Sequence, residues 1–179
     1  MPKLLSNPPF NMKWDGSPTV PSANANFAFV EKALKLSDRA AFIFPASILD
    51  SPDCKETSFR KMLIENNLLE SVIKCPEKMF ESTSISVCIL TINKNKEDKG
   101  FMMIDASQFC EQEIREQAGQ FGGKSHTNRI YKKALNIFSE EQISQIVEMV
   151  LKRISTVGLS QEVFQKEIEK QDWCFTPAR

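Results

Sequence analysis

The tetrapeptide Asn7-Pro8-Pro9-Phe10 combines residue types that could hold an aromatic amine and make it reactive. The exocyclic amine of a nucleic-acid base is a poor nucleophile because its lone pair is delocalised into the ring. Hydrogen-bond acceptors that favour a more tetrahedral nitrogen counter this, and an asparagine side-chain oxygen is one. A proline-rich turn can fix a backbone carbonyl as a second acceptor, and phenylalanine could stack on a flipped base. The tetrapeptide therefore indicates a base pocket, although Asn-Pro-Pro also occurs in ordinary turns and Phe10 could instead anchor the core.

No second set of reactive residues accompanies this turn in the sequence. The one histidine, His126, lies in a polar stretch without an obvious nucleophile or metal ligand, and we interpret it as a surface residue. The number of cysteines is odd and no C-x-x-C pair occurs, which argues against disulfides and a zinc site and fits a reducing cytoplasm. The five cysteines are Cys54, Cys75, Cys88, Cys110 and Cys174.

Strands and helices alternate around the turn, which favours an α/β fold. Residues 3–6 are typical of a strand that Asn-Pro-Pro must end, because proline cannot donate to a ladder. Apolar spacing predicts a helix over 25–36. The run 39–48 has strand length and two apolar faces, as in a strand covered by helices on both sides. The turn then lies just past a strand end, where ligand sites form in such sheets.

Further elements complete the predicted sheet. We expect a short helix over 58–67 and a short strand over 69–75. The stretch 84–94 is the strongest strand prediction because it is rich in β-branched residues. Another apolar run begins at Gly100, and the short polar loop between these two strands predicts an antiparallel pair.

The chain changes character after Phe109. Residues 111–136 are polar and are expected to form a mobile loop, or a short helix with a loop. Ser139–Gln142 is a capping-box pattern ahead of a periodic helix, and a weaker helical stretch covers 160–170.

Composition limits the kinds of partner. The chain has 179 residues and a formal net charge of zero. The charge of the whole chain therefore gives no support for nucleic-acid binding, and any DNA contact must use a local patch or a partner protein. No run of about 18 apolar residues is present, so no segment is expected to span a membrane.

Ordered pieces of the sequence resemble the modification subunit of type I restriction–modification systems, within the adenine-specific DNA methyltransferases. The family's catalytic loop is similar to LLSNPPFNMKWD, and its next helix is similar to NANFAFVEKAL. Later strands and helices of the family resemble DRAAFIFPASIL, RKMLIENNLLESVIKCPEKMFESTSISVCILTINKNK, FMMIDAS, NIFSEEQISQIVE and IEKQDWCFTPAR. The resemblance covers nearly the whole chain and is weakest at 108–134.

The resemblance implies a partial Rossmann-like methyltransferase sheet that ends in an antiparallel strand pair and is followed by a C-terminal helical segment. It also implies methyl transfer from S-adenosylmethionine to the exocyclic amino group of adenine in DNA. Asn7 would accept a hydrogen bond from that amino group and the Pro8 carbonyl would accept a second, while Pro9 would hold the turn rigid. Phe10 would stack on the flipped base. The implied segments are 1–107 (C-terminal half of the catalytic domain), 108–138 (polar loop or insertion) and 139–179 (C-terminal helical tail).

The sequence departs from the family at the cofactor site. The family places a glycine-rich cofactor loop upstream of the NPPF turn, whereas the glycines of this chain form no such loop after a strand. Asn26 stands where the family often has aspartate. Asn26 and Phe29 are weak candidates for cofactor contact, and core packing is the better interpretation of Phe29. S-adenosylmethionine is expected as the cofactor of the whole family enzyme, whereas this chain by itself is expected to hold none.

Candidate DNA contacts come from two segments. Lys13 and Trp14 follow the pocket turn, and Trp14 could support the base pocket or cover the core. Lys124, Arg129 and Lys132 belong to a basic cluster that could touch the phosphate backbone or form a solvated loop. The resemblance also implies DNA, a specificity subunit that chooses the recognition sequence, and a restriction subunit as partners.

Two hypotheses describe the chain as a whole. In the first it is the C-terminal half of an adenine methyltransferase subunit, a fragment that is inactive by itself. In the second it is a non-catalytic interaction module. Its exposed edge strand at 3–6 would then complement a separate cofactor-binding half or form a homo-oligomer.

Overall fold

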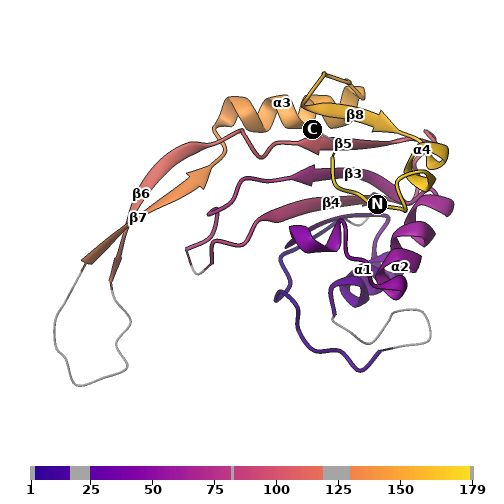
Figure 1. Ribbon diagram of the computed structural model, residues 1–179, viewed down its shortest axis with the longest axis horizontal. Coiled ribbons are helices and arrows are strands. Elements are labelled where there is room, and N and C mark those ends of the chain that lie inside the picture. Colours follow the sequence, from indigo (N-terminus) through magenta and orange to yellow (C-terminus); the bar gives the residue numbers. More distant parts are fainter. Residues whose placement is uncertain (1–2, 17–24, 82, 119–129, 178–179) are drawn as a thin grey trace.

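The computed structural model describes residues 3–16, 25–81, 83–118 and 130–177, whose strands form a six-stranded sheet and a separate two-stranded hairpin (Figure 1). The strands are β1 (Lys3–Ser6), β2 (Arg39–Pro45), β3 (Leu69–Lys74), β4 (Val87–Asn93), β5 (Phe101–Asp105), β6 (Glu111–Ala118), β7 (Ile130–Ile137) and β8 (Ser160–Val163). The helices are α1 (Asn26–Leu36), the short 3-10 helix η1 (Ala46–Ile48), α2 (Cys54–Glu65), α3 (Glu140–Lys152) and α4 (Gln165–Glu169).

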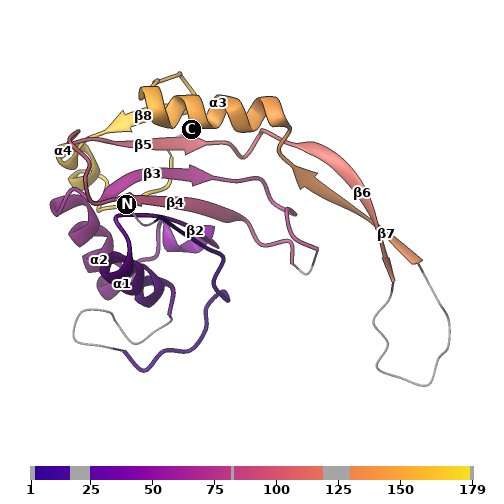
Figure 2. The same ribbon diagram turned by 180° about the vertical axis from the view of Figure 1, so that it is seen from behind.

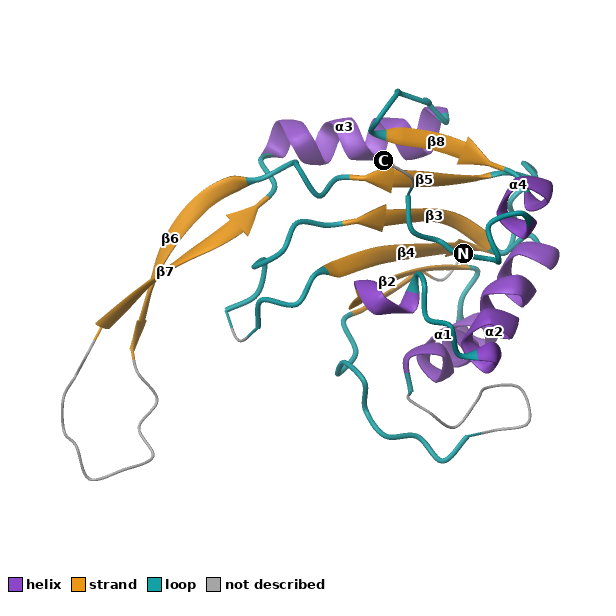
Figure 3. Cartoon of the chain, in the orientation of Figure 1, coloured by secondary structure: helices purple, strands orange, loops and turns teal. Residues whose placement is uncertain are grey.

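The large sheet is mixed, with the order β1-β2-β4-β3-β5-β8 (Figure 3). The pairs β1–β2 and β3–β5 are parallel, and the remaining neighbours are antiparallel. A parallel pair needs a crossover connection, and α1 lies in the connection between β1 and β2. The predicted α/β fold is confirmed. Because β1 and β2 run in the same direction, the Asn7–Phe10 turn and the segment 46–53 leave the sheet at the same edge.

Helices cover the two faces of this sheet unequally (Figure 2). On one face, α1 and α2 pack over a first core cluster, and on the other, α3 lies along β5 over a second core cluster. The largest members of the first cluster are Phe27, Phe42, Phe44, Phe59, Leu63, Phe101 and Phe175. The second cluster consists of Ile73, Cys75, Val87, Met102, Ile104, Ala106, Ile146 and Met149.

The second face is less covered toward β1 and β2. Ile43 and Ile89 are only half-buried there, and Leu5 on β1 is 87% exposed. We expected the strand within 39–48 to be covered by helices on both sides, and this is wrong because α3 lies along β5 instead. An apolar strip of the sheet therefore remains open near β1.

Caps set the helix boundaries. The Asp53 carboxylate accepts from the backbone N–H of Lys55 at 2.8 Å and of Glu56 at 3.3 Å, so α2 begins four residues before the predicted start. The predicted capping box at Ser139 is confirmed, because Gln142 N–H donates to Ser139 Oγ and Ser139 N–H donates to Gln142 Oε1. None of the helices in the described ranges has the length and apolarity needed to cross a bilayer.

The predicted pairing of the strand 84–94 with the apolar run that begins at Gly100 is wrong, because β3 lies between β4 and β5. The connection from β4 to β5 passes the start of β3 instead of making a hairpin. Lys96 fixes this passage, since its Nζ donates to the Leu69 carbonyl at 2.7 Å and to the Gly100 carbonyl at 2.6 Å. The closeness of β4 and β5 in the sequence could not show that β3 lies between them in the sheet.

Two polar segments form strands that we did not predict. Within 111–136, β6 and β7 pair as an antiparallel hairpin instead of a loop or short helix. Charged or amide side chains fill most of β6 and interrupt β7, so the apolar alternation of a half-buried strand is missing from the sequence. Residues 160–163 form β8 on the far edge of the sheet, and only 165–169 of the expected 160–170 helix is helical.

Arg60 ties the C-terminal segment to the sheet. Its guanidinium is buried and donates to the carbonyls of Trp173 at 2.9 Å, Ile48 at 3.1 Å and Ser51 at 2.8 Å, and to Thr57 Oγ1 at 3.0 Å. A buried charge is tolerated when its donors are satisfied, and here it joins three chain segments. Arg60 therefore stabilises the loop that follows β2.

Candidate functional site

The Asn7-Pro8-Pro9-Phe10 turn leaves the carboxyl end of β1. Asn7 and Pro9 are exposed, Pro8 is buried and Phe10 is half-buried. Within the described residues, neither the Asn7 side-chain amide nor the Pro8 carbonyl has a hydrogen-bonding partner. Two adjacent acceptors thus lack a hydrogen-bonding partner among the described residues, at the end of a parallel strand, where α/β sheets bind ligands.

Asn26, the first residue of α1, anchors the end of this turn. Its side chain is fully buried, and its Nδ2 donates to Asn11 Oδ1 at 3.2 Å while its Oδ1 accepts from Asn11 N–H at 3.4 Å. Asn11 has a φ of 51°, in the left-handed region that asparagine tolerates better than most residues. The backbone N–H of Ala25 adds a bond to the Met12 carbonyl at 2.9 Å. The structure thus shows Asn26 holding the turn in place.

Phe80 is the neighbour of Phe10 that sequence reasoning missed. The two ring centroids lie 5.9 Å apart with the planes at 90°, an edge-to-face pair. Both side chains pack against the second core cluster. Phe80 lies in the connection between β3 and β4, about seventy residues along the chain from Phe10. The sequence offered only one weak signal, an aromatic residue just before the strongest strand.

A polar cavity of about 380 Å³ opens beside the anchored turn, at the carboxyl ends of β1 and β2. Carboxylate, amide and hydroxyl side chains are among its lining residues, and the Asp53 carboxylate among them also caps α2. Its described lining consists of Asn11, Asn26, Ser47, Ile48, Asp50, Ser51, Pro52, Asp53 and Glu56. These groups suit a ligand that carries hydroxyl or amino donors.

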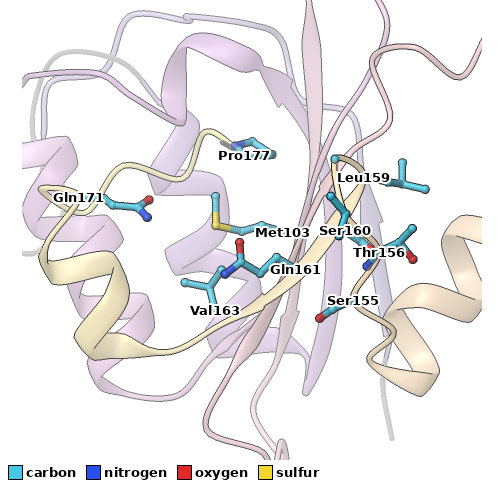
Figure 4. A pocket seen from close by; sticks show the side chains of 11 residues that line it. Met103, Ser155, Thr156, Leu159, Ser160, Gln161, Val163, Gln171 and Pro177 are labelled. Atoms are coloured by element: carbon cyan, nitrogen blue, oxygen red, sulfur yellow. The ribbon is translucent and has the colours of Figure 1, made fainter. Parts of the chain in front are cut away.

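A second cavity, of about 470 Å³, lies beside β8 at the opposite edge of the sheet (Figure 4). Met103, Gln161 and Val163 on the sheet face Gln171 and Pro177 of the C-terminal segment across it. Among its described lining residues none is charged and none belongs to the Asn7–Phe10 turn. We therefore place the candidate site at the polar end of β1 and β2.

Other predicted site residues lie apart from the turn. Trp14 and Phe29 pack against the first core cluster, on the sheet face opposite to Phe10. This packing favours the core interpretation for both residues. Lys13 is exposed one residue before Trp14.

The predicted basic cluster is only partly described. Lys124 and Arg129 lie outside the described residues. Lys132 is exposed on β7, with its Nζ 3.8 Å from a carboxylate oxygen of Glu116 on β6. The hairpin thus places the acidic Glu116 opposite the basic Lys132, a pairing that was not evident from the sequence.

The family description N-6 DNA Methylase matches residues 1–179 of this sequence. The chain belongs to the N-6 DNA methylase family. Its relatives include the methylase subunit of the type I restriction enzyme MjaIX from Methanocaldococcus jannaschii, which is 27% identical over 98% of this chain and 34% of the relative. The MjaVII methylase subunit from the same organism is 30% identical over 86% of this chain and 24% of the relative.

A crystal structure with the same fold comes from the methyltransferase subunit of a type I restriction–modification system of Streptococcus thermophilus. It superimposes with a TM-score of 0.77 at 22% identity, covering 97% of this chain and 36% of that one. The chain therefore spans between a quarter and about a third of the length of these N-6 DNA methylase relatives. The predicted resemblance to type I methylase subunits is confirmed.

The cofactor that this family implies is S-adenosylmethionine, and the described residues fit it only in part. The polar cavity offers acceptors for hydroxyl and amino groups, but no glycine lines its described walls. Close approach of backbone to a ligand commonly requires glycine. Gly100 instead lies against Glu162, and Gly158 lies in an exposed turn. The described residues therefore do not form a complete cofactor site.

Proposed function

We propose that this chain supplies the adenine-holding part of a DNA adenine methyltransferase, the site at which the N6 amino group of a flipped adenine accepts a methyl group from S-adenosylmethionine. The observation that carries the proposal is the turn after β1. It carries the Asn7 amide and the Pro8 carbonyl, which have no partner among the described residues, beside the half-buried ring of Phe10. Membership of the N-6 DNA methylase family supports the same reaction.

The chemistry of these residues acts on the amine. Asn7 Oδ1 and the Pro8 carbonyl oxygen each accept one hydrogen bond from the N6 amino group. These two bonds draw the nitrogen toward tetrahedral geometry, which makes its lone pair available for reaction. The two proline rings limit backbone motion, so the acceptors are positioned before the base arrives. No general base is needed among these residues, because the proton can leave after the methyl group has transferred.

The two aromatic rings hold the base plane. A flipped base loses its stacking in the helix, and stacking on an aromatic side chain is worth about 1–3 kcal/mol per base. We assign the stacking face to Phe10 and a bordering edge to Phe80, from their perpendicular arrangement.

A base-flipping assay tests the stacking part of the pocket with a duplex that carries 2-aminopurine, a fluorescent base without the 6-amino group, opposite an abasic site, where extrusion costs little. Titration with the wild-type chain should change the fluorescence saturably. Phe10→Leu keeps an apolar side chain but removes the stacking ring, so binding should weaken by about fivefold to tenfold. Phe164→Leu, at an exposed phenylalanine next to α4, is the matched control and should bind like the wild type. Equal binding by all three chains would refute the base pocket.

We further propose that the chain by itself does not bind the methyl donor tightly. The support is the polar cavity beside the turn, whose described walls include no glycine. Isothermal titration calorimetry of the chain with S-adenosylmethionine should show no micromolar binding. A micromolar dissociation constant would contradict this part of the proposal without affecting the base pocket.

DNA is the proposed substrate, and specificity and restriction subunits are the proposed partners. This follows from similarity to methylase subunits of type I restriction enzymes. In such an assembly the specificity subunit would choose the sequence, which agrees with the zero net charge of this chain.

A second candidate function, a non-catalytic interaction module, is favoured by one observation. Within the described residues β1 is an edge strand that pairs only with β2, and its Leu5 side chain is 87% exposed. Such an edge can pair with a strand of another protein or of a second copy. Light scattering over a concentration series should then show self-association that Leu5→Lys reduces, and a chain that stays monomeric throughout would count against pairing between copies.

A further inference from the structure

The position of Phe80 depends on a long irregular connection. Residues 75–86 join β3 to β4, the described ones (75–81 and 83–86) form neither helix nor strand, and Phe80 lies near the middle of the connection. A connection of this length has many conformations, and ordering each residue costs about 1–2 kcal/mol. Contacts from elsewhere in the fold must therefore hold Phe80 next to Phe10.

Those contacts come from the root of the β6–β7 hairpin, the part nearest the sheet (Figure 1). Asn136 on β7 makes two of them, because its Nδ2 donates to the Glu77 carbonyl at 2.8 Å and its backbone N–H donates to the Lys78 carbonyl at 3.0 Å. Lys133 Nζ donates to the Glu81 carbonyl, and Arg115 Nη1 lies 3.5 Å from a carboxylate oxygen of Glu81. The hairpin thus makes hydrogen bonds to the connection on both sides of Phe80.

The contacts from the hairpin hold the backbone of Lys78 in an unfavourable conformation. Its φ of 57° lies in the left-handed region, which a lysine side chain adopts rarely. Such a residue persists only where its surroundings fix it, and the bond from Asn136 N–H to the Lys78 carbonyl does so. Without this bond the backbone at Lys78 would relax and carry Phe80 with it.

We propose that the hairpin root is a positioning element of the base pocket and that Asn136 is the residue that holds Phe80 in place. This proposal deepens the proposed function and rests on it for the meaning of the pocket. The hairpin projects away from the sheet (Figures 1 and 2). A partner or DNA segment that moved it would therefore act on the aromatic pair through Asn136.

The test compares Asn136→Asp with a matched control in the whole 179-residue chain. Asn136→Asp keeps the size and the backbone N–H of the residue but removes the donor to the Glu77 carbonyl and sets a carboxylate against it. Gln112 lies directly across the hairpin from Asn136 and is exposed, so Gln112→Glu makes the same charge change at the neighbouring position. Both variants should have the circular dichroism spectrum of the wild type.

The readout is the nuclear Overhauser effect between the ring protons of Phe10 and Phe80. Asn136→Asp should lower its intensity at least twofold, and Gln112→Glu should leave it unchanged. An unchanged effect in Asn136→Asp would overturn the proposal. If that variant fails to fold, Lys133→Met removes the donor to the Glu81 carbonyl and should lower the effect in the same way, and an unchanged effect there would overturn the proposal.

The 2-aminopurine titration separates this proposal from the proposed function. If the wild type binds the 2-aminopurine duplex about fivefold more tightly than Asn136→Asp does, both the positioning role and the base pocket are supported. Equal binding by these two chains overturns the positioning role and leaves the base pocket standing. A third outcome is that Asn136→Asp weakens the nuclear Overhauser effect between Phe10 and Phe80 while the wild type does not bind the 2-aminopurine duplex. This outcome supports the positioning role of Asn136 and refutes the base pocket.

Discussion

Replacing Asn26 by alanine should loosen the turn that carries the proposed base pocket. The substitution removes the two bonds to Asn11, at 3.2 and 3.4 Å, from a fully buried side chain. A net hydrogen bond is worth about 0.5–1.5 kcal/mol, and a buried partner left unsatisfied costs about 1–3 kcal/mol. We therefore expect the free energy of unfolding to fall by about 2–3 kcal/mol.

Urea unfolding followed by circular dichroism measures this loss. With a slope of about 2 kcal/mol per molar, the midpoint should fall by about 1–1.5 M. Asn66→Ala is the control, because its exposed amide bonds only the Met62 carbonyl of its own helix and should cost about 0.5 kcal/mol. A loss in Asn26→Ala no larger than in Asn66→Ala would refute the anchoring role. The 2-aminopurine binding of Asn26→Ala should also weaken, since the turn would no longer be held.

Three further predictions concern the rest of the fold. Arg60→Met should lower the free energy of unfolding by about 3–5 kcal/mol, because three carbonyls lose their buried donor; a loss below about 1 kcal/mol in urea unfolding would contradict this. Burial lowers the pKa of the Lys96 ammonium to about 8, with the charge of Arg153 as a smaller cause. The unfolded chain therefore binds more protons between pH 8 and 10.5, so stability should rise across that window, and Lys96→Met should reduce the rise. Burial raises the pKa of the Cys75 thiol to about 12 and also raises the pKa of Cys88; both should react with a disulfide reagent at pH 8 only after unfolding, and fast reaction of either in the native chain would count against their burial. The thiols expected to react at once are Cys54 and Cys110.

The first hundred residues could be predicted well because their apolar patterns are local. β1, α1, β3 and β5 lie close to their expected ranges, since period and composition report which face each segment buries. The order of the strands could not be predicted in the same way. The insertion of β3 between β4 and β5 depends on long-range pairing, and the short polar connection with Lys96 is compatible with either arrangement.

The polar strands were missed for a different physical reason. β6 and β7 satisfy their backbone groups against each other, and charged residues such as Arg115 opposite Lys133 and Glu116 opposite Lys132 interrupt their apolar positions, so no regular apolar alternation marks them. The candidate site was likewise only half visible in the sequence. The candidate roles of Asn7 and Phe10 follow from residue types, whereas Phe80 meets Phe10 only through the fold, and Asn136 bonds to the connection that carries Phe80.

The central claim is that Asn7 and Pro8 recognise the amino group of adenine. Nuclear magnetic resonance titration of the labelled chain with dAMP, compared with the same nucleotide lacking the 6-amino group, tests it most directly. The account predicts saturable shifts at Asn7, Phe10 and Phe80 with dAMP, and binding weaker by about threefold to tenfold for the analogue and for Asn7→Ala. Equal binding of the two nucleotides, or shifts confined to residues outside this turn, would contradict it.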